Sequence, residues 1–387
     1  MRLMHLADLH LGKVVNGFSM LEDQAYILQQ ILGLLAAGQT DAVLIAGDVY
    51  DRAVPPEEAV RLYDGFLTEL SARRIPVLVI GGNHDSGERL AFGDKLLAAS
   101  GVHICGNYEG DLQQVVLEDE HGPLHIHLLP FVKPYGVRRH FPDQEIKNYA
   151  DALAAVMQRA VIDTSQRNVL VAHQFVLPAK GEPDTSDSEQ NQLGGIDQVP
   201  AALFERFDYV ALGHLHKAQA MGLPHVRYAG SPLKYSFSEA GERNGHSIQK
   251  SITWIDLAAK GTVDISQQYL CPRRDLREIK GSFAAVSAPE YIAAQSTQDY
   301  LHITLTDEQE VYDAIGRLRV HYPYIMQLDY DNVRSRSVAD FSRTAEVETR
   351  TPLEMFADFF AEMNGKQPNE AQLDVIETHM RREEGQA

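Results

Sequence analysis

The sequence is poor in cysteine and contains no long apolar run. Its 387 residues include two cysteines, Cys105 and Cys271, without CxxC spacing. Two thiols cannot build a disulfide framework or a thiolate zinc site, so both are expected to be reduced and inert. No run of about 18 apolar residues occurs, so no membrane span is expected. Asp8 and His10 interrupt the N-terminal apolar stretch, which argues against a signal peptide and for a cytoplasmic protein.

An excess of basic residues is also lacking. Lys and Arg number 35 against 54 Asp and Glu, for a net charge of −19. A nucleic-acid-binding surface must neutralise phosphates, so this balance taken alone argues against such a partner. The total does not show where the charges lie, and bound divalent cations would offset part of the negative charge.

Strand-like apolar runs alternate with helix-like stretches in the first half of the chain, where 44% hydrophobic residues overall allow a sizeable core. This alternation indicates an α/β layered fold. The expected strands cover residues 2–7, 42–47, 76–81, 101–105, 124–130, 168–173 and 209–214, and the expected helices cover 21–37, the segment opened by Pro55 and Pro56, and 150–161. The polar, Gly-rich segment 180–195 is expected to be a loop, either a solvated insertion or a lid.

The pattern changes near residues 271–281. A small unit follows, with helices expected near 288–295 and 307–321 and strands at 300–305 and 324–330. Two terminal helices are expected at 351–363 and 369–382. A chain of this length suggests two or three domains, and we expect them at 1–275, 276–340 and 341–387.

Apolar residues recur at helical spacing in the last segment. Such a stripe usually packs into a core. Two short terminal helices can hardly bury their own apolar face, so docking on a partner is the better explanation. The residues expected at that contact are Leu353, Phe356, Phe359, Phe360, Leu373 and Ile376.

Polar side chains stand where several expected strands end. Asp8, Asp48, Asn83, His173 and His214 each lie at the C-terminal end of such a run. Any one of these positions could arise by chance, and a lone histidine in an apolar run is more often a core residue. In open α/β sheets this edge is where ligand sites form. The combination therefore predicts a common site.

The residue types at these positions suit a pair of divalent cations. Carboxylate, imidazole and amide donors without thiolate favour Mn²⁺, Fe²⁺ or Zn²⁺. A single zinc needs three or four ligands, and the sequence offers more. Asp48 is our choice for a carboxylate that bridges both ions. Two cations about 3.5–4 Å apart can clamp the attacking and leaving oxygens of a phosphoryl transfer and lower the pKa of a bound water.

His84 follows Asn83 directly and must project differently from it. It could stabilise the transition state or protonate the leaving oxygen. Asp85 could orient the ring of His84, or it could cap the next helix, and the two roles are compatible.

Together these motifs resemble the calcineurin-like metallophosphoesterase family. The match runs in order over Asp8-x-His10, Gly47-Asp48-x-x-Asp51-Arg52, Gly82-Asn83-His84-Asp85, His173 and Gly213-His214-x-His216. The resemblance implies a four-layer α/β/β/α sandwich in which Asp48 bridges two metals and His84 meets the scissile phosphate. It also implies one metal held by Asp8, His10 and His216, and another held by Asn83, His173 and His214.

Within this family the chain resembles the DNA nuclease subunits of bacterial ATP-dependent complexes that act in recombination, repair and replication. The segments MHLADLHLGK, GDVYDRAVPP and YAGSPLKYSFSE carry this likeness, with the small domain and the helical tail. It implies Mn²⁺, 3′–5′ exonuclease action on duplex DNA ends and endonuclease action on hairpins and single strands. It further implies a small α/β capping domain that binds DNA, and a homodimer within a heterotetramer with an SMC-type ATPase. That partner would supply much of the DNA affinity, so the negative net charge of this chain would not prevent the complex from binding DNA.

Some relatives place a histidine near the position of Asp51, and here Asp51-Arg52 stands instead. A second catalytic histidine is therefore in question, and contacts of Asp51 with substrate or with a partner are both open. The candidate phosphate contacts are Arg89, Lys133, Arg138, Arg139 and Lys234, although each taken alone is more simply a solvated charge.

Three other readings compete. A small-molecule or cyclic-nucleotide phosphodiesterase would share every metal ligand but has no use for the small domain and tail. A Ser/Thr protein phosphatase would need an Arg directly before the triplet Gly82-Asn83-His84, and the sequence has Gly81-Gly82 there. A non-enzymatic scaffold is disfavoured by the complete ligand set.

Overall fold

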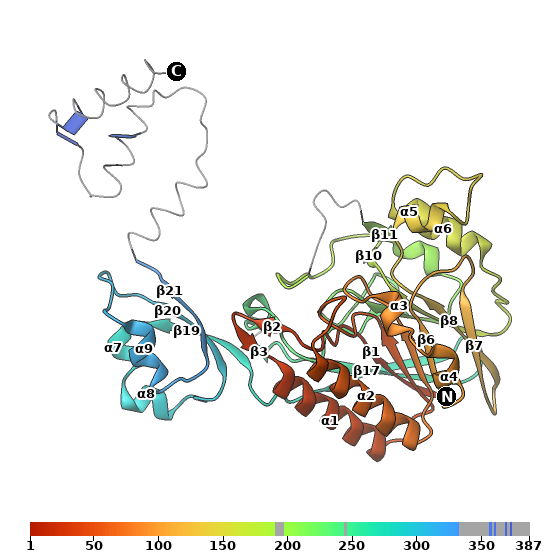
Figure 1. Ribbon diagram of the computed structural model, residues 1–387, viewed down its shortest axis with the longest axis horizontal. Coiled ribbons are helices and arrows are strands. Elements are labelled where there is room, and N and C mark those ends of the chain that lie inside the picture. Colours follow the sequence, from red (N-terminus) through yellow and green to blue (C-terminus); the bar gives the residue numbers. More distant parts are fainter. Residues whose placement is uncertain are drawn as a thin grey trace. The chain divides into compact units, whose positions relative to one another are not determined.

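The computed structural model describes residues 1–189, 197–243 and 246–332, with positions 356, 357, 360, 368, 369, 372 and 373. The chain divides into two compact units, Met1–Arg277 and Glu278–Ala387 (Figure 1). In the part of the chain that is described, no helix is long and apolar enough to cross a membrane.

The larger unit contains two six-stranded sheets. The first has the order β18-β17-β1-β4-β5-β6. Its parallel strands are β1 (Arg2–Leu6), β4 (Ala42–Ala46), β5 (Val77–Ile80) and β6 (Val102–Cys105), and the antiparallel pair β17 (Ser251–Leu257) and β18 (Val263–Tyr269) extends it. All five residues of β4 are buried, as expected for a strand covered on both faces.

The second sheet has the order β13-β14-β12-β9-β8-β7. Its parallel strands are β8 (Gly122–Leu129), β9 (Arg167–His173), β12 (Tyr209–Gly213) and β14 (Val226–Tyr228), and the antiparallel edges are β7 (Gln113–Asp119) and β13 (Gln219–Ala220). We did not expect β7 or β18 from the sequence, because both are mostly exposed and carry no continuous apolar run.

The two sheets pack face to face through alternate residues of their strands. Leu44 and Leu78 of the first sheet join Ile126 and Val171 of the second in one cluster, and each is 0% exposed. Removing one such side chain from water contributes about 1.5–3 kcal/mol. The period-two alternation therefore fixes the register of the sandwich.

Helices cover the outer faces of the sandwich. Helices α1 (Leu21–Ala37) and α2 (Glu57–Ala72) lie side by side along the first sheet (Figure 1). Helices α5 (Pro134–Arg138) and α6 (Tyr149–Arg159) and the 3₁₀ turn η1 (Ala201–Phe204) share an apolar cluster with the second sheet. The expected α/β/β/α layering is confirmed.

Short elements complete this unit: β2 (Val14–Val15), β3 (Phe18–Ser19), α3 (Gly87–Leu90), α4 (Asp94–Ala98), β10 (Phe175–Leu177), β11 (Gln198–Pro200), η2 (Phe237–Glu239), β15 (Glu242–Arg243) and β16 (His246–Ser247).

The second unit has its own core. A three-stranded sheet, β19 (Leu276–Gly281), β20 (Tyr300–Leu305) and β21 (Ile325–Tyr330), is accompanied by α7 (Phe283–Val286), α8 (Pro289–Ala293) and α9 (Ala314–Arg319). Leu301, Ile303 and Leu318 are buried together there. Helix α9 starts later than the expected residue 307 because Asp313, its N-cap, adopts a left-handed φ of 46°.

The expected tail helices fall mostly outside the described residues, as do the predicted contact residues Leu353, Phe359 and Ile376. Phe356 and Phe360 are both helical, and their ring centroids lie 6.2 Å apart. Leu373 is also helical. Their role in binding a partner stays a prediction.

Candidate metal centre

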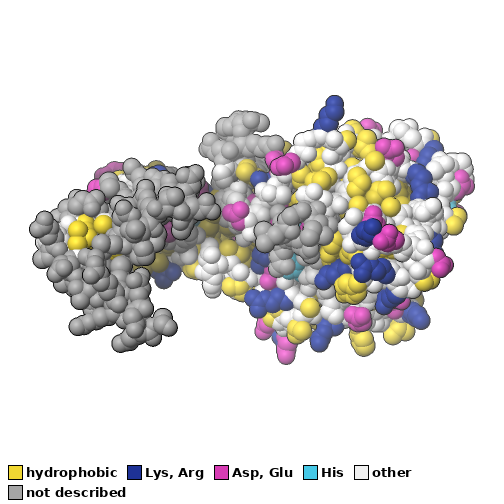
Figure 2. Space-filling model, turned by 90° about the horizontal axis from the view of Figure 1, so that it is seen from above, with side chains coloured by type: hydrophobic (Ala, Val, Ile, Leu, Met, Phe, Trp, Pro, Cys, Tyr) yellow, Lys and Arg dark blue, Asp and Glu magenta, His cyan; other side chains and the backbone are white. Residues whose placement is uncertain are grey.

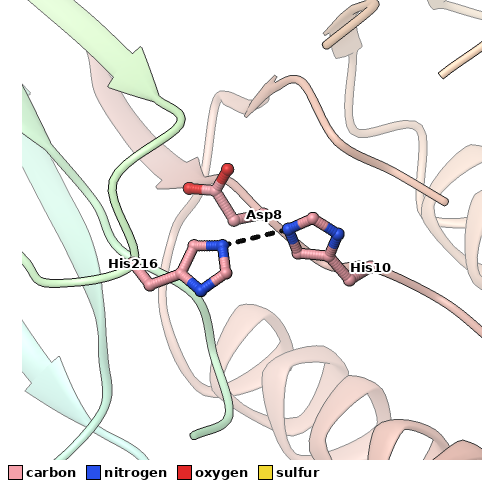
Figure 3. Close-up of side chains that lie close together, drawn as sticks. All are labelled: Asp8, His10 and His216. Carbon is pink, nitrogen blue, oxygen red and sulfur yellow. Dashed lines mark hydrogen bonds between the residues drawn. The ribbon is translucent and has the colours of Figure 1, made fainter. Parts of the chain in front are cut away.

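The carboxyl ends of parallel strands from both sheets meet at one edge of the sandwich. Asp8 and His10 follow β1, Asp48 follows β4, and Asn83 and His84 follow β5. His173 ends β9, and His214 and His216 follow β12. Residues from distant parts of the chain thus converge, and Figure 3 shows Asp8, His10 and His216 doing so. The structure places each predicted metal ligand in this cluster.

Several of these side chains stand on backbone that L-residues rarely adopt. The φ angles are 54° at Asp8, 44° at His10, 49° at Asp48 and 108° at His214. Such conformations cost on the order of 1–3 kcal/mol each and persist where the surrounding structure enforces them, often at functional sites. Four such residues in one cluster indicate that the fold accepts backbone strain in order to place these side chains.

Glycine is required where the ligand loops touch. A Cβ on Gly82 would collide with the carboxylate and the backbone nitrogen of Asp48. A Cβ on Gly213 would collide with the carbonyl of Ala46 and crowd the ring of His173. Gly82 therefore allows two loops of the first sheet to approach closely, and Gly213 allows the end of β12 in the second sheet to approach the end of β4 in the first.

One group of donors is formed by Asp8, His10 and His216. Their ligand atoms lie within 4.8 Å of one another, and all three residues are buried. Nε2 of His10 lies 3.0 Å from Nε2 of His216 (Figure 3). Two imidazole nitrogens that face each other at this distance are placed to share one cation.

A second group surrounds Asn83. Its Oδ1 lies 3.0 Å from Nε2 of His173 and 3.0 Å from Nδ1 of His214. Asp48 stands between the groups, because its Oδ2 lies 3.4 Å from Nε2 of His173 and 3.7 Å from Nε2 of His10. Its other oxygen accepts the N–H of His84 at 2.9 Å. This position favours Asp48 as the bridge, a role that stays a prediction.

A buried oxygen without a partner shows that the cluster fits a cation. Oδ2 of Asp8 is buried and has no hydrogen-bond partner among the described residues. An unpaired buried carboxylate oxygen is costly unless an ion compensates it. The oxygen and nitrogen donors match the preference of Mn²⁺, Fe²⁺ or Zn²⁺, so the residues present fit a pair of divalent ions.

Burial sets the protonation of these groups. It lowers the pKa of His10 and His216 well below the usual range and that of His214 to about 3. Neutral imidazole is the form that binds metals. Burial raises the pKa of Asp8. For His173 burial lowers the pKa, but the nearby Asp48 carboxylate outweighs it and raises the value to about 9. A bound cation would take the place of that proton.

The ring of His84 is oriented by a backbone carbonyl. Nδ1 of His84 lies 2.9 Å from the carbonyl oxygen of Asp51, and the ring stacks edge-on against His10 at 4.8 Å between centroids. Nδ1 therefore donates to Asp51. This leaves Nε2 as the nitrogen that can meet a substrate.

Asp85 neither orients the ring of His84 nor caps the following helix. Its carboxylate accepts backbone N–H groups of Val49, Tyr50 and Gly82 at 2.9–3.1 Å. The following helix has Ser86 at its N-cap, without a side-chain cap. The predictions that Asp85 orients His84 or caps the helix are wrong, because backbone donors of two ligand loops occupy its oxygens. Asp85 joins the Asp48 loop to the Asn83 loop, and burial raises its pKa to about 6.

Asp51 takes part in contacts inside the molecule. Its Oδ1 accepts from Nζ of Lys13 at 2.7 Å and lies 3.6 Å from Nδ1 of His10. The side chain of Lys13 is only 13% exposed. Position 51 thus holds one member of an ion pair beside the predicted metal ligand His10.

The predicted phosphate contacts differ in availability. Lys234 is buried and bonded to Asp275 at 3.0 Å, so its assignment to DNA is wrong: its charge is already neutralised inside the protein.

The other four candidates are exposed. The Nε of Arg138 donates to the carbonyl of Ile146. Arg139 is exposed and pairs with Glu109 at 3.8 Å. Arg89 and Lys133 are exposed, and DNA binding by any of these four stays a prediction.

The sequence analysis did not identify the residues that form hydrogen bonds to the predicted ligands. Nε2 of Gln24 donates to the carbonyl of His10 at 2.7 Å, and Ser188 and Glu189 contact His216. No motif marks them. The only signal was the polar character of the segment 180–195, which did not distinguish a contact from solvation.

A family model gives the class of protein. Residues 1–218 match the calcineurin-like phosphoesterase model, and residues 272–364 match the model of the type 5 capsule protein repressor C-terminal domain. The chain belongs to the calcineurin-like phosphoesterase family and is a metal-dependent phosphoesterase.

Within that family the chain is SbcD-like. It is 31% identical over 380 residues to a Staphylococcus epidermidis protein named as a subunit of the nuclease SbcCD, covering 97% of each chain. The TT1561 protein of Thermus thermophilus aligns in structure at a TM-score of 0.36 and 11% identity, over 69% of this chain and 98% of that one. That likeness is too low to support an argument.

Proposed function

We propose that the chain is the nuclease subunit of an SbcCD-type complex and hydrolyses DNA phosphodiester bonds with two Mn²⁺ ions. The main structural support for this proposal is a buried cluster at one edge of the sandwich, formed by Asp8, His10, Asp48, His173 and His216. Support for DNA as the substrate comes from full-length similarity to a protein named as a nuclease subunit. Such a substrate fits a cytoplasmic location.

The donor groups would hold the ions, with Asp8, His10 and His216 at one site and Asn83, His173 and His214 at the other. When bound, two such ions supply charge stabilisation and an activated water for phosphoryl transfer. Asp48 would hold the two sites in register through its Oδ2. The hydrogen bond from the His214 N–H to Oδ1 of Asp8, 2.9 Å long, joins the loops of the two sheets.

His84 would act on the phosphodiester itself. Because Nδ1 donates to the Asp51 carbonyl, Nε2 carries a proton only when the ring is cationic. The cationic ring can donate to a phosphoryl oxygen or pass its proton to the leaving oxygen. Either action requires Nε2 to face the substrate.

The partner of this subunit would be an SbcC-like SMC-type ATPase, bound through the tail that carries Phe356, Phe360 and Leu373. The proposed assembly is a heterotetramer with two copies of this chain. The proposed DNA structures are duplex ends, degraded 3′–5′, and hairpins or single strands, cut internally. The second unit, with β19, β20 and β21, would contribute to DNA binding as a capping domain.

The test compares substrates with the purified chain, alone and with its co-expressed partner. We expect Mn²⁺-dependent release of nucleotides from linear duplex DNA that exceeds hydrolysis of a generic aryl phosphodiester. Hydrolysis of the aryl or a cyclic-nucleotide ester without cleavage of DNA, in the presence of the partner, would instead assign a small-molecule phosphodiesterase.

A further inference from the structure

Hydrogen bonds fix His216 at each of its main-chain polar groups and at one ring nitrogen. Its N–H donates to Oε1 of Glu189 at 2.6 Å, and its carbonyl accepts from Nζ of Lys250 at 2.7 Å. Its Nδ1 lies 2.7 Å from Oγ of Ser188. Two of these partners, Ser188 and Glu189, come from the polar segment 180–195, whose sequence was compatible with either an insertion or a lid. Figure 2 shows one face of the molecule and the mixture of charged and apolar side chains on it.

Ser188 is itself held by buried groups. Its Oγ lies 3.4 Å from Oε1 of Glu239 and 2.8 Å from Oγ of Ser186. Glu239 is 0% exposed and forms an ion pair with Lys250, which also donates to His216. A closed set of polar contacts thus surrounds the side of His216 that faces away from the donor cluster.

This arrangement selects one tautomer of His216. A serine hydroxyl has a single proton, and the Glu239 carboxylate can only accept it. Ser188 therefore donates toward Glu239 and accepts the Nδ1 proton of His216. Nε2 is left with a free lone pair, and it is the atom 3.0 Å from Nε2 of His10. The nitrogen that faces the donor group is thereby kept in the form that binds a cation.

The other donor group does not depend on these contacts. Nδ1 of His173 lies 2.7 Å from the carbonyl oxygen of Ala46, at the end of the buried strand β4. Nδ1 of His214 lies beside Asn83. The ring orientation of His173 is therefore fixed by the core of the first sheet, whereas that of His216 is fixed by a polar loop.

We propose that Ser188 is a positioning residue for His216, assisted by Glu189, and that residues 186–189 set the cation affinity of the Asp8, His10 and His216 group alone. The inference rests on the proposed function only in so far as the cluster binds divalent cations. It makes the two ions unequal: one depends on a polar loop and the other does not.

The test is a Mn²⁺ titration of the metal-free full-length chain, monitored by calorimetry and by the paramagnetic signal of free Mn²⁺. Ser188→Ala should weaken one of two Mn²⁺ equivalents by about tenfold to a hundredfold, the usual effect of losing such an outer hydrogen bond, and leave the other unchanged. Ser188→Thr keeps the hydroxyl and should restore the weakened equivalent. Ser165→Ala removes an exposed hydroxyl bonded to Asp163 and should behave as the parent protein.

Turnover provides a second readout. A positioning role predicts that Ser188→Ala raises the Mn²⁺ concentration needed for half-maximal rate, while saturating Mn²⁺ recovers the maximal rate. Equal affinities in Ser188→Ala and the parent, parallel weakening of both equivalents, or failure of the threonine variant to restore binding would overturn the proposal. Failure of the parent protein to bind Mn²⁺ at all would instead contradict the proposed function.

Discussion

His10 and His216 are separated by 206 positions in the sequence, yet their Nε2 atoms lie 3.0 Å apart. One follows β1 of the first sheet and the other follows β12 of the second sheet. The contact exists only because the two sheets pack face to face with their parallel strands ending at the same edge. Each prediction about the centre depends on this convergence.

His84→Gln should abolish DNA cleavage and leave Mn²⁺ binding intact. The ring lies against His10 but its Nδ1 bonds to a backbone carbonyl, so its removal takes away a proton donor and no proposed ligand. Loss of general acid catalysis costs about 10²–10⁴-fold in rate. Single-turnover cleavage together with metal analysis measures both quantities. Turnover within about tenfold of the parent would contradict the role given to His84.

Asp48→Asn should reduce the Mn²⁺ content of the protein. The substitution removes a negative charge from a carboxylate whose Oδ2 lies close to ring nitrogens of both donor groups. Elemental analysis after dialysis against a fixed Mn²⁺ concentration measures the loss, and Asp264→Asn, at an exposed position of β18, is the matched control. Two bound ions per chain in Asp48→Asn would exclude a bridging role.

Asp119→Asn should lower the stability of the larger unit by on the order of 1 kcal/mol at neutral pH, as expected for a partly exposed ion pair. Asp119 bonds to Arg167, whose Nη1 lies 3.1 Å away, and this contact holds the pKa of Asp119 well below its usual range. A depressed carboxyl pKa stabilises the fold above the unfolded value of about 3.9, and the benefit is lost as the pH falls below it.

Urea unfolding of the Asp119→Asn variant and its parent at a series of pH values measures this difference. The gap in midpoint should be full at pH 7 and shrink as the pH drops below about 4. A gap that stays constant down to acid pH would show that Asp119 acts by packing rather than by charge. Asp264→Asn again serves as the control, because it is exposed.

Deleting residues 345–387 should abolish binding to the SbcC-like ATPase and spare metal binding. The apolar residues at helical spacing in this tail are expected to be buried only against a partner. The donor cluster lies entirely within the first 216 positions, so its Mn²⁺ content should not change. Co-purification and metal analysis of the truncated chain make the comparison. An intact complex after truncation would refute the assignment of the tail.

The buried central strands and the positions of the candidate ligands could be predicted from the amino-acid pattern. Apolar runs such as residues 42–47 and 168–173 are strands in the structure, because a strand covered on both faces must be apolar throughout. Polar residues that interrupt the ends of such runs have no place in a core, so Asp8, Asp48 and His173 identified the site. The mostly exposed β7 lacked this signal, and its existence could not be predicted.

The partner of each side chain depends on how the chain packs in three dimensions. Nothing in the local sequence shows that Asp85 holds three backbone N–H groups, that Lys234 is neutralised by Asp275, or that Ser188 reaches His216. Hydrogen bonds depend on distances of about 3 Å, and the packing of the two sheets sets these distances between residues far apart in the chain.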